Sequence, residues 1–144
     1  EGHASDENAD VVLHYASGLR ASVVASWQAG PEPVWDAQLA SDHGVLRAEL
    51  MPRPSLEHDG RPVRLPEPSV PVAAVEQFGY LAQLQALARH VALGETPVMN
   101  AGFGRMVLDV VCAAYRSAGR GGDVEHLPFQ GARDRTPLQL WRGE

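Results

Sequence analysis

The sequence contains no lysine, a single cysteine and no apolar run long enough to cross a lipid bilayer. One cysteine excludes an intrachain disulfide and a zinc site built from several thiolates. The formal net charge is -6 at pH 7, so the chain lacks the basic surface that attracts nucleic acids and anionic membranes. We therefore expect neither nucleic acid nor membrane as a partner.

What the chain does contain is enough apolar material for one compact domain. It has 144 residues, of which 44% are hydrophobic. Residues 1–9 form a polar, acidic lead-in without the basic and apolar regions of a signal peptide. With the single cysteine, this favours a cytoplasmic protein. The absence of an initiator methionine suggests that the chain is part of a longer one.

The first half shows the period-two alternation of apolar and polar residues that is typical of antiparallel strands. Ser17-Gly18 and Asp59-Gly60 are hairpin signals. A further turn is expected at residues 42–44, and a proline-containing loop at 66–71. The predicted strands cover residues 10–16, 19–28, 34–41, 45–50, 55–58 and 62–65.

The second half shows the spacing of helices. The first helix is predicted over about 75–93, with Gly94 as its C-terminal cap. Asn100 can cap a second helix, which residues 119–122 terminate. This helix is apolar on more than one side, so we expect it to be buried on more than one side. A last short strand is predicted at 123–128. In the basic tail that follows, the apolar side chains that can dock on the body are Leu138, Leu140 and Trp141.

Strands followed by helices predict an α+β fold, a mostly antiparallel sheet of about six strands with two main helices packed on one face. The predicted organisation is a lead-in at 1–9, the α+β domain at 10–128 and a C-terminal tail at 129–144. A sheet face left open by the helices would be a natural contact between subunits. We therefore expect a homo-oligomer formed through that face.

Five segments follow one another over nearly the whole chain: ADVVLHYASGLRASVVASW (9–27), SDHGVLRAEL (41–50), FGYLAQLQALARHVALGETPV (78–98), AGFGRMVLDVVCAAYRSAGRGGDVEHLP (101–128) and RDRTPLQLWRG (133–143). In this order they resemble the C-terminal half of the Gfo/Idh/MocA oxidoreductases. In the second segment Gly44 and Leu46 match a G-x-x-G-x-L element of the family, and Ser41 replaces its first glycine.

The resemblance implies a substrate-side and oligomerisation domain of an enzyme that transfers a hydride between NAD or NADP and a sugar, inositol or related polyol. The dinucleotide-binding half of such an enzyme is not in this sequence. The partial match Gly102-Phe103-Gly104 lacks the third glycine of the fingerprint, and the family's catalytic lysine is absent. We therefore expect no catalytic and no cofactor-binding residue here, and no activity of the chain alone.

The resemblance also points to two candidate substrate-binding residues, because side chains at the first edge of the family's sheet close over the polyol. Trp35 would stack on an apolar sugar face, and Gln38 would bond a hydroxyl. The alternative for Trp35 is packing in the core or at a subunit contact, both of which favour aromatic residues.

Other chemistry finds little support in the sequence. Asp10 and His14 have the spacing of a pair that the family carries on a helix, but they lie in a strand pattern, so we read that spacing as coincidental. Cys112 is expected to be a core thiol, and the dispersed carboxylates to be solvated surface groups. No metal site is expected, because none of the six histidines has a partner at ligand spacing: His3, His14, His43, His58, His90 and His126.

Two other interpretations stay open. One is a stand-alone dimerising or small-ligand-binding module that has lost the nucleotide-binding domain. The other is an unrelated α+β domain of cystatin-like or ferredoxin-like type, whose strand order would differ.

Overall fold

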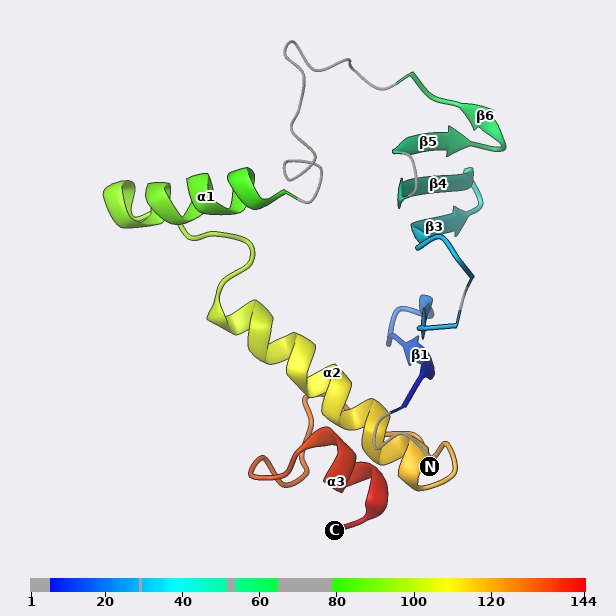
Figure 1. Ribbon diagram of the computed structural model, residues 1–144, viewed down its shortest axis with the longest axis vertical. Helices are drawn as coiled ribbons and strands as arrows, with labels where there is room; N and C mark the ends of the chain where they lie inside the picture. Colours follow the sequence, from blue (N-terminus) through cyan, green and yellow to red (C-terminus); the bar gives the residue numbers. More distant parts are fainter. Residues whose placement is uncertain (1–5, 29, 52–53, 65–78) are drawn as a thin grey trace. The chain divides into compact units, whose positions relative to one another are not determined.

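The computed structural model describes residues 6–28, 30–51, 54–64 and 79–144. The chain divides into two units, one made mainly of Asp10–Val23 and Ala86–Glu144 and the other mainly of Val24–Gln85. Strands precede helices, which confirms the predicted α+β class (Figure 1). The elements are β1 (Asn8–His14), β2 (Arg20–Ser26), β3 (Trp35–Ser41), β4 (Gly44–Met51), β5 (Ser55–His58), β6 (Arg61–Pro62), α1 (Tyr80–Leu93), α2 (Ala101–Gly119) and α3 (Pro137–Arg142).

The six strands form two antiparallel sheets rather than the single sheet that we expected. One sheet has the order β1-β2 and the other the order β3-β4-β5-β6. The break falls in the segment between β2 and β3, where Pro31 and Pro33 provide no backbone N–H for a ladder. Within each sheet, strands that are consecutive in the sequence pair with each other. The predicted packing of helices on one sheet face stays a prediction.

Two tight turns determine the register of the larger sheet. The β3–β4 turn contains Asp42 and His43, and Ser41 pairs with Gly44, whose φ of 119° suits glycine. At the β5–β6 turn Asp59 and Gly60 both have positive φ, 50° and 72°, as a two-residue hairpin of the primed kind requires. The predicted turn at 42–44 and the predicted hairpin at Asp59-Gly60 are thus confirmed.

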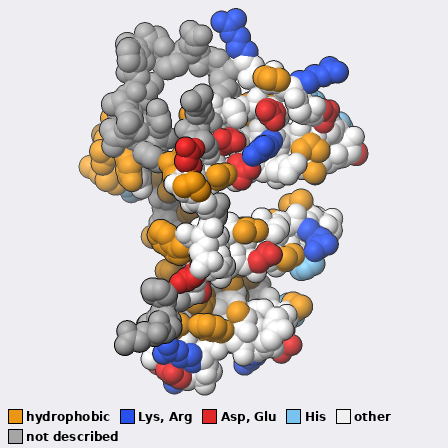
Figure 2. Space-filling model, turned by 45° about the vertical axis from the view of Figure 1, so that its right-hand side comes forward, with side chains coloured by type: hydrophobic (Ala, Val, Ile, Leu, Met, Phe, Trp, Pro, Cys, Tyr) orange, Lys and Arg blue, Asp and Glu red, His pale blue; other side chains and the backbone are white. Residues whose placement is uncertain are grey.

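Alternation along these strands gives the larger sheet one apolar and one polar face. Residues directly opposite each other in the register share a face. Leu39 and Leu46 on the apolar face are 59% and 38% exposed, and hydrophobic side chains are visible at the molecular surface in Figure 2. The mainly apolar face holds Ala37, Leu39, Leu46, Ala48 and Leu56 together with Ser41 and His58, and the mainly polar face holds Asp36, Gln38, Arg47, Glu49, Ser55 and Glu57 together with Ala40 and Val45.

A glycine ends helix α1, and an asparagine begins helix α2. The N–H of Gly94 donates to the carbonyl of His90 at 2.9 Å after α1, and Gly94 has a φ of 72°. Asn100 caps α2 by accepting a hydrogen bond from the N–H of Phe103 at 3.0 Å. Both predicted caps are confirmed. Residues 75–78 of the first predicted helix and the predicted loop at 66–71 lie outside the described residues.

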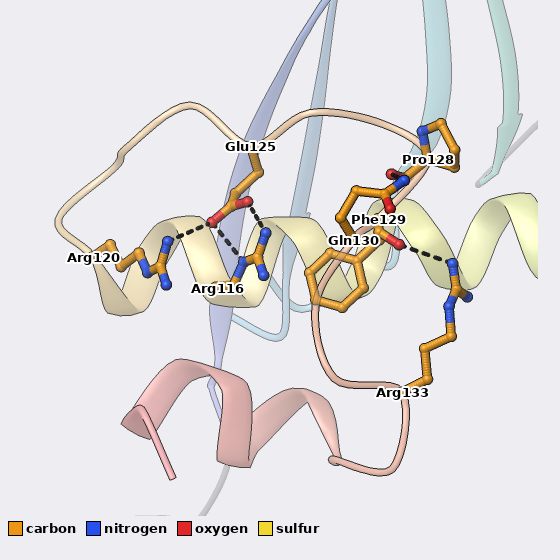
Figure 3. Close-up of polar contacts among 7 residues, drawn as sticks. All are labelled: Arg116, Arg120, Glu125, Pro128, Phe129, Gln130 and Arg133. Carbon is orange, nitrogen blue, oxygen red and sulfur yellow. Dashed lines mark hydrogen bonds and ion pairs between the residues drawn. The ribbon is translucent and has the colours of Figure 1, made fainter.

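The prediction that α2 is buried on more than one side is wrong. Only Asp109 and Ala113 of its residues are buried, and Leu108 is 61% exposed. In the described part of the chain, the loop around Phe129 and helix α3 pack on the second half of α2 (Figure 3). Apolar composition alone therefore overestimated how much of this helix is covered.

A small core holds the C-terminal segments together. It comprises Ala113, Phe129 and Leu140, with Cys112 packed against it, which confirms Cys112 as a core thiol and the docking of the tail through Leu140. Phe129 is 1% exposed. Helix α3 begins at a reciprocal capping box between Thr136 and Gln139.

The strand predicted at 123–128 is wrong, because that segment is irregular in the structure. Two glycines with positive φ, Gly121 and Gly122, turn the chain directly after α2. The side chain of Glu125 then bonds back to Arg116 of α2, so the segment follows the helix instead of joining a sheet.

Two glycines of α2 give a matched test of how closely α3 docks. A Cβ on Gly119 would overlap the backbone carbonyl of Trp141, whereas a Cβ on Gly104 would meet no atom within 4 Å. We expect Gly119→Ala to lower the free energy of unfolding by roughly 1–3 kcal/mol through overpacking. Gly104→Ala should raise it by about 0.4–1 kcal/mol through reduced entropy of the unfolded chain. Urea unfolding followed by circular dichroism measures both, and equal shifts would contradict the docking.

Candidate functional site

The candidate site is the polar face of the larger sheet, centred on Gln38 and Arg47. Gln38 of β3 lies directly opposite Arg47 of β4, and Arg47 lies opposite Glu57 of β5. The three side chains therefore form a row across three strands. The register that places them in one row follows from the turn after Ser41, as described above.

Two carboxylates orient the guanidinium of Arg47. Its Nε and Nη2 donate to Asp36 Oδ2 at 3.2 and 3.0 Å, and Nη2 also donates to Glu49 Oε2 at 3.4 Å. The Arg47 side chain is 46% exposed and that of Asp36 is 41% exposed. Ion pairs this exposed are worth about 0–1 kcal/mol, so they orient the groups more than they stabilise the fold.

The polar face can bind a ligand rich in hydroxyl groups. Carboxylates accept, a guanidinium donates, and the Gln38 amide does both, which is the complementarity that a polyol needs. Hydride transfer would additionally need a nicotinamide cofactor. Gly102 and Gly104 lie within helix α2, so the partial glycine motif forms no loop that could surround a phosphate.

Trp35 does not join Gln38 at this site. Successive residues of a strand point to opposite faces, so Trp35 at the start of β3 lies on the side of Ala37 and Leu39. The register shift between Trp35 and Asp36 comes from an extra residue, Leu50, in β4 and leaves the alternation of β3 intact. Trp35 is 59% exposed. A ligand lying on the polar face would contact Gln38 and not Trp35.

The other titratable groups that the sequence singled out are scattered in the described structure. Asp10 and His14 lie on β1, as expected, and Asp10 Oδ1 accepts a hydrogen bond from the Ser22 hydroxyl at 3.4 Å. Among the described residues, no group of three or more histidine, cysteine, aspartate or glutamate side chains is placed to hold a metal ion. His3 lies outside the described residues.

The buried charges lie elsewhere, around Phe129. Arg116 Nε donates to Glu125 Oε1 at 2.7 Å, its Nη2 bonds Glu125 Oε2, and Arg120 Nη1 reaches Oε1 at 3.4 Å (Figure 3). The Arg116 guanidinium also lies 4.5 Å from the centre of the Phe129 ring. The Glu125 side chain is only 8% exposed. This arrangement fixes the loop after α2 to the helix.

A second ion pair anchors the segment beyond Phe129. Arg133 donates through Nη1 to Asp109 Oδ1 at 2.9 Å and through Nη2 to the Phe129 carbonyl at 2.8 Å. Asp109 is 7% exposed. The interpretation of all the carboxylates as solvated surface groups is therefore wrong for Asp109 and Glu125. No local spacing reveals these pairs, because their partners are separated by 24 and 9 residues.

The hydrogen bonds of the cluster shift the pKa values of its members. The hydrogen bond from Arg116 lowers the pKa of Glu125, and burial opposes this only in part. The same bond raises the pKa of Arg116. Tyr115 donates its hydroxyl proton to Asp6 Oδ1 at 2.5 Å, and that bond raises the pKa of Tyr115.

A pocket of about 240 Å³ lies beside this cluster. Both of its arginines bond Glu125, and the carboxylate of Glu144 also lines the pocket, so the charges around it are balanced and do not favour an anionic ligand. The cluster is structural, and the exposed polar face of the sheet is the better ligand site. The pocket is lined by Arg116, Gly119, Arg120, Ala132, Leu140, Gly143 and Glu144.

The lowered pKa of Glu125 predicts a pH dependence of stability. The ionised form is favoured in the folded chain, so its contribution is full above the unfolded pKa of about 4.3 and is lost as pH falls through the lower folded value. We expect the stability difference between the wild type and Glu125→Gln to shrink as pH falls below about 4. Urea titrations at several pH values measure it. Exposed Asp123→Asn is the control, and a constant difference would contradict the assignment.

No helix of the described residues is both long and apolar enough to span a membrane. Comparison with known proteins gives no family assignment. No family model, no curated protein and no solved structure matches this chain. A function must therefore be argued from the motifs and from the geometry of the polar face.

Proposed function

We propose that this chain is the substrate-side and oligomerisation domain of a cytoplasmic NAD(P)-dependent oxidoreductase of Gfo/Idh/MocA type. Its substrate would be a sugar, inositol or related polyol, and the chain would be inactive without a nucleotide-binding domain. The observation that carries the proposal is the exposed row of Gln38 and Arg47, with Arg47 oriented by Asp36.

The order of structural elements supports the resemblance. The segment 9–27 contains the β1–β2 hairpin, and 41–50 contains the β3–β4 turn and most of β4. The segments 78–98 and 101–128 contain α1 and α2. Each of these four motifs thus falls on a regular element of an α+β fold, as a domain of this type requires.

The two faces of the larger sheet suit the two proposed roles. The polar face offers hydrogen-bond donors and acceptors for hydroxyls, while the nicotinamide of the other domain would supply the hydride. The apolar face leaves Trp35, Leu39 and Leu46 exposed. Fully burying an exposed leucine side chain contributes about 1.5–3 kcal/mol, and covering these partly exposed side chains contributes a share of that, which favours contact with another apolar surface. Assembly through that face would leave the polar face open.

Titration with polyols tests the substrate side. We expect myo-inositol or glucose to shift the side-chain amide resonances of Gln38 in ¹⁵N-labelled chain. Gln38→Ala should weaken binding by about 2- to 13-fold, because one hydrogen bond is worth about 0.5–1.5 kcal/mol. Gln83→Ala, an exposed glutamine of α1, is the matched control and should change nothing. If saturating polyol left Gln38 unperturbed, the proposal would be wrong.

Titration with NADH and NADPH tests whether this chain binds the cofactor without a nucleotide-binding domain. We expect no change in cofactor fluorescence, since Gly102 and Gly104, the partial match to the dinucleotide fingerprint, lie within helix α2 and form no loop around a pyrophosphate. Micromolar binding of either cofactor to the chain alone would contradict the assignment to a substrate-side domain.

A further inference from the structure

The larger sheet ends in two very different edge strands. The strand β6 contains two residues, Arg61 and Pro62, and a short strand with a proline and a charge is a poor template for further pairing. The strand β3 forms the opposite edge, since the strand order is β3-β4-β5-β6. It has seven residues, no proline and one charged side chain, Asp36. Within the described part of the chain, the strand itself offers none of the usual protection of an edge apart from the irregularity at Trp35.

The register identifies which backbone groups of β3 point away from the sheet. In a two-residue hairpin the residues that flank the turn exchange both hydrogen bonds, so Ser41, Leu39 and Ala37 bond to β4. Ala40 is opposite Val45, and Val45 uses its own N–H and carbonyl on the β5 side, toward Asp59. The hydrogen bonds on both sides of β4 therefore agree on which residues bond to β3 and which bond to β5. The outward-pointing N–H and carbonyl groups are those of Asp36, Gln38 and Ala40.

We propose that the β3 edge pairs with the β3 edge of a second copy of this chain, antiparallel and with the two-fold axis at Gln38. In this register Gln38 faces Gln38 of the other copy, and Asp36 faces Ala40. All three outward residues of one copy then meet outward residues of the other, which makes a continuous sheet of eight strands.

Charge disfavours two of the neighbouring registers, and the others shorten the overlap of the two strands. A shift that centres the axis on Asp36 would place two carboxylates opposite each other, and like charges in that position are destabilising. Centring the axis one residue after Gln38, at Leu39, would place Asp36 opposite Asp42. With the axis at Gln38 the whole strand Trp35–Ser41 overlaps and no carboxylate faces another.

Edge pairing differs from assembly through the apolar face and does not depend on the proposed enzymatic role. It leaves both faces of the sheet uncovered, so a polyol on the polar face and a contact on the apolar face stay compatible with it. Loss of the dimer in a variant of one surface, and not of the other, separates the two modes of assembly.

Disulfide trapping tests the register directly. In a Cys112→Ser background, Gln38→Cys places two thiols in a hydrogen-bonded pair with Cα atoms about 5.5 Å apart, within disulfide range. Ala40→Cys is the matched control on the same edge, because the Cα atoms at that position in the two copies would be separated by about 13 Å along the strands. We expect oxidised dimer on non-reducing gels for the first variant only. Monomer for Gln38→Cys, or equal dimer for both, would overturn the inference.

A proline substitution tests the hydrogen bonds themselves. Gln38→Pro removes an outward N–H and no bond to β4, so the hairpin should keep its circular dichroism spectrum. We expect the dimer dissociation constant from light scattering to rise about thirtyfold, because one N–H bond per copy is lost. Gln38→Ala keeps the N–H and should leave it unchanged. If instead Leu39→Glu dissociates the dimer and Gln38→Pro does not, the apolar face and not the edge joins the copies.

Discussion

The register of β3 against β4 is the constraint on which the candidate site and the free edge both depend. The two-residue turn at Asp42 and His43 determines it, and Gly44 supplies the positive φ that the return strand needs. From the other side of β4, Asp59 bonds Val45 twice, through its own N–H and through its carboxylate. A slip of one residue would exchange the two faces and move Arg47 to the apolar side.

Stability and ligand recognition use different charged groups in this chain. The best-buried carboxylates, Asp109 and Glu125, are both bound by arginines around Phe129. Removing one partner of such a pair leaves a poorly solvated charge, so these groups cannot readily release their arginines to a ligand. Asp36, the carboxylate that holds Arg47 most closely, is by contrast 41% exposed. Exposure makes that interaction weak, and for the same reason a hydroxyl can replace it.

Features set by a few neighbouring residues could be predicted from the sequence. The hairpin at Asp59-Gly60, the cap at Gly94 and the cap at Asn100 each need only local backbone chemistry, and all three are confirmed. The strand predicted at 123–128 failed because a distant partner, Arg116, decides the path of that segment. Contacts between residues far apart in sequence leave no periodic signal.

The candidate site was only half predictable for a related reason. The resemblance grouped Gln38 and Trp35 because both fall in the stretch that corresponds to the first edge of the family's sheet. Alternation along one strand nevertheless places their side chains on opposite faces. The importance of Arg47 follows from pairing across strands, which the sequence shows only once the β3–β4 turn is placed.

The same geometry decides how this sheet can assemble and still bind a ligand. Pairing through the polar face would take Arg47 and its carboxylates out of water, at a desolvation cost that their mutual attraction repays only with very good geometry. Growth at the β3 edge uses backbone groups and buries none of these charges. The unprotected edge beside an exposed polar face therefore permits assembly and ligand binding in the same molecule.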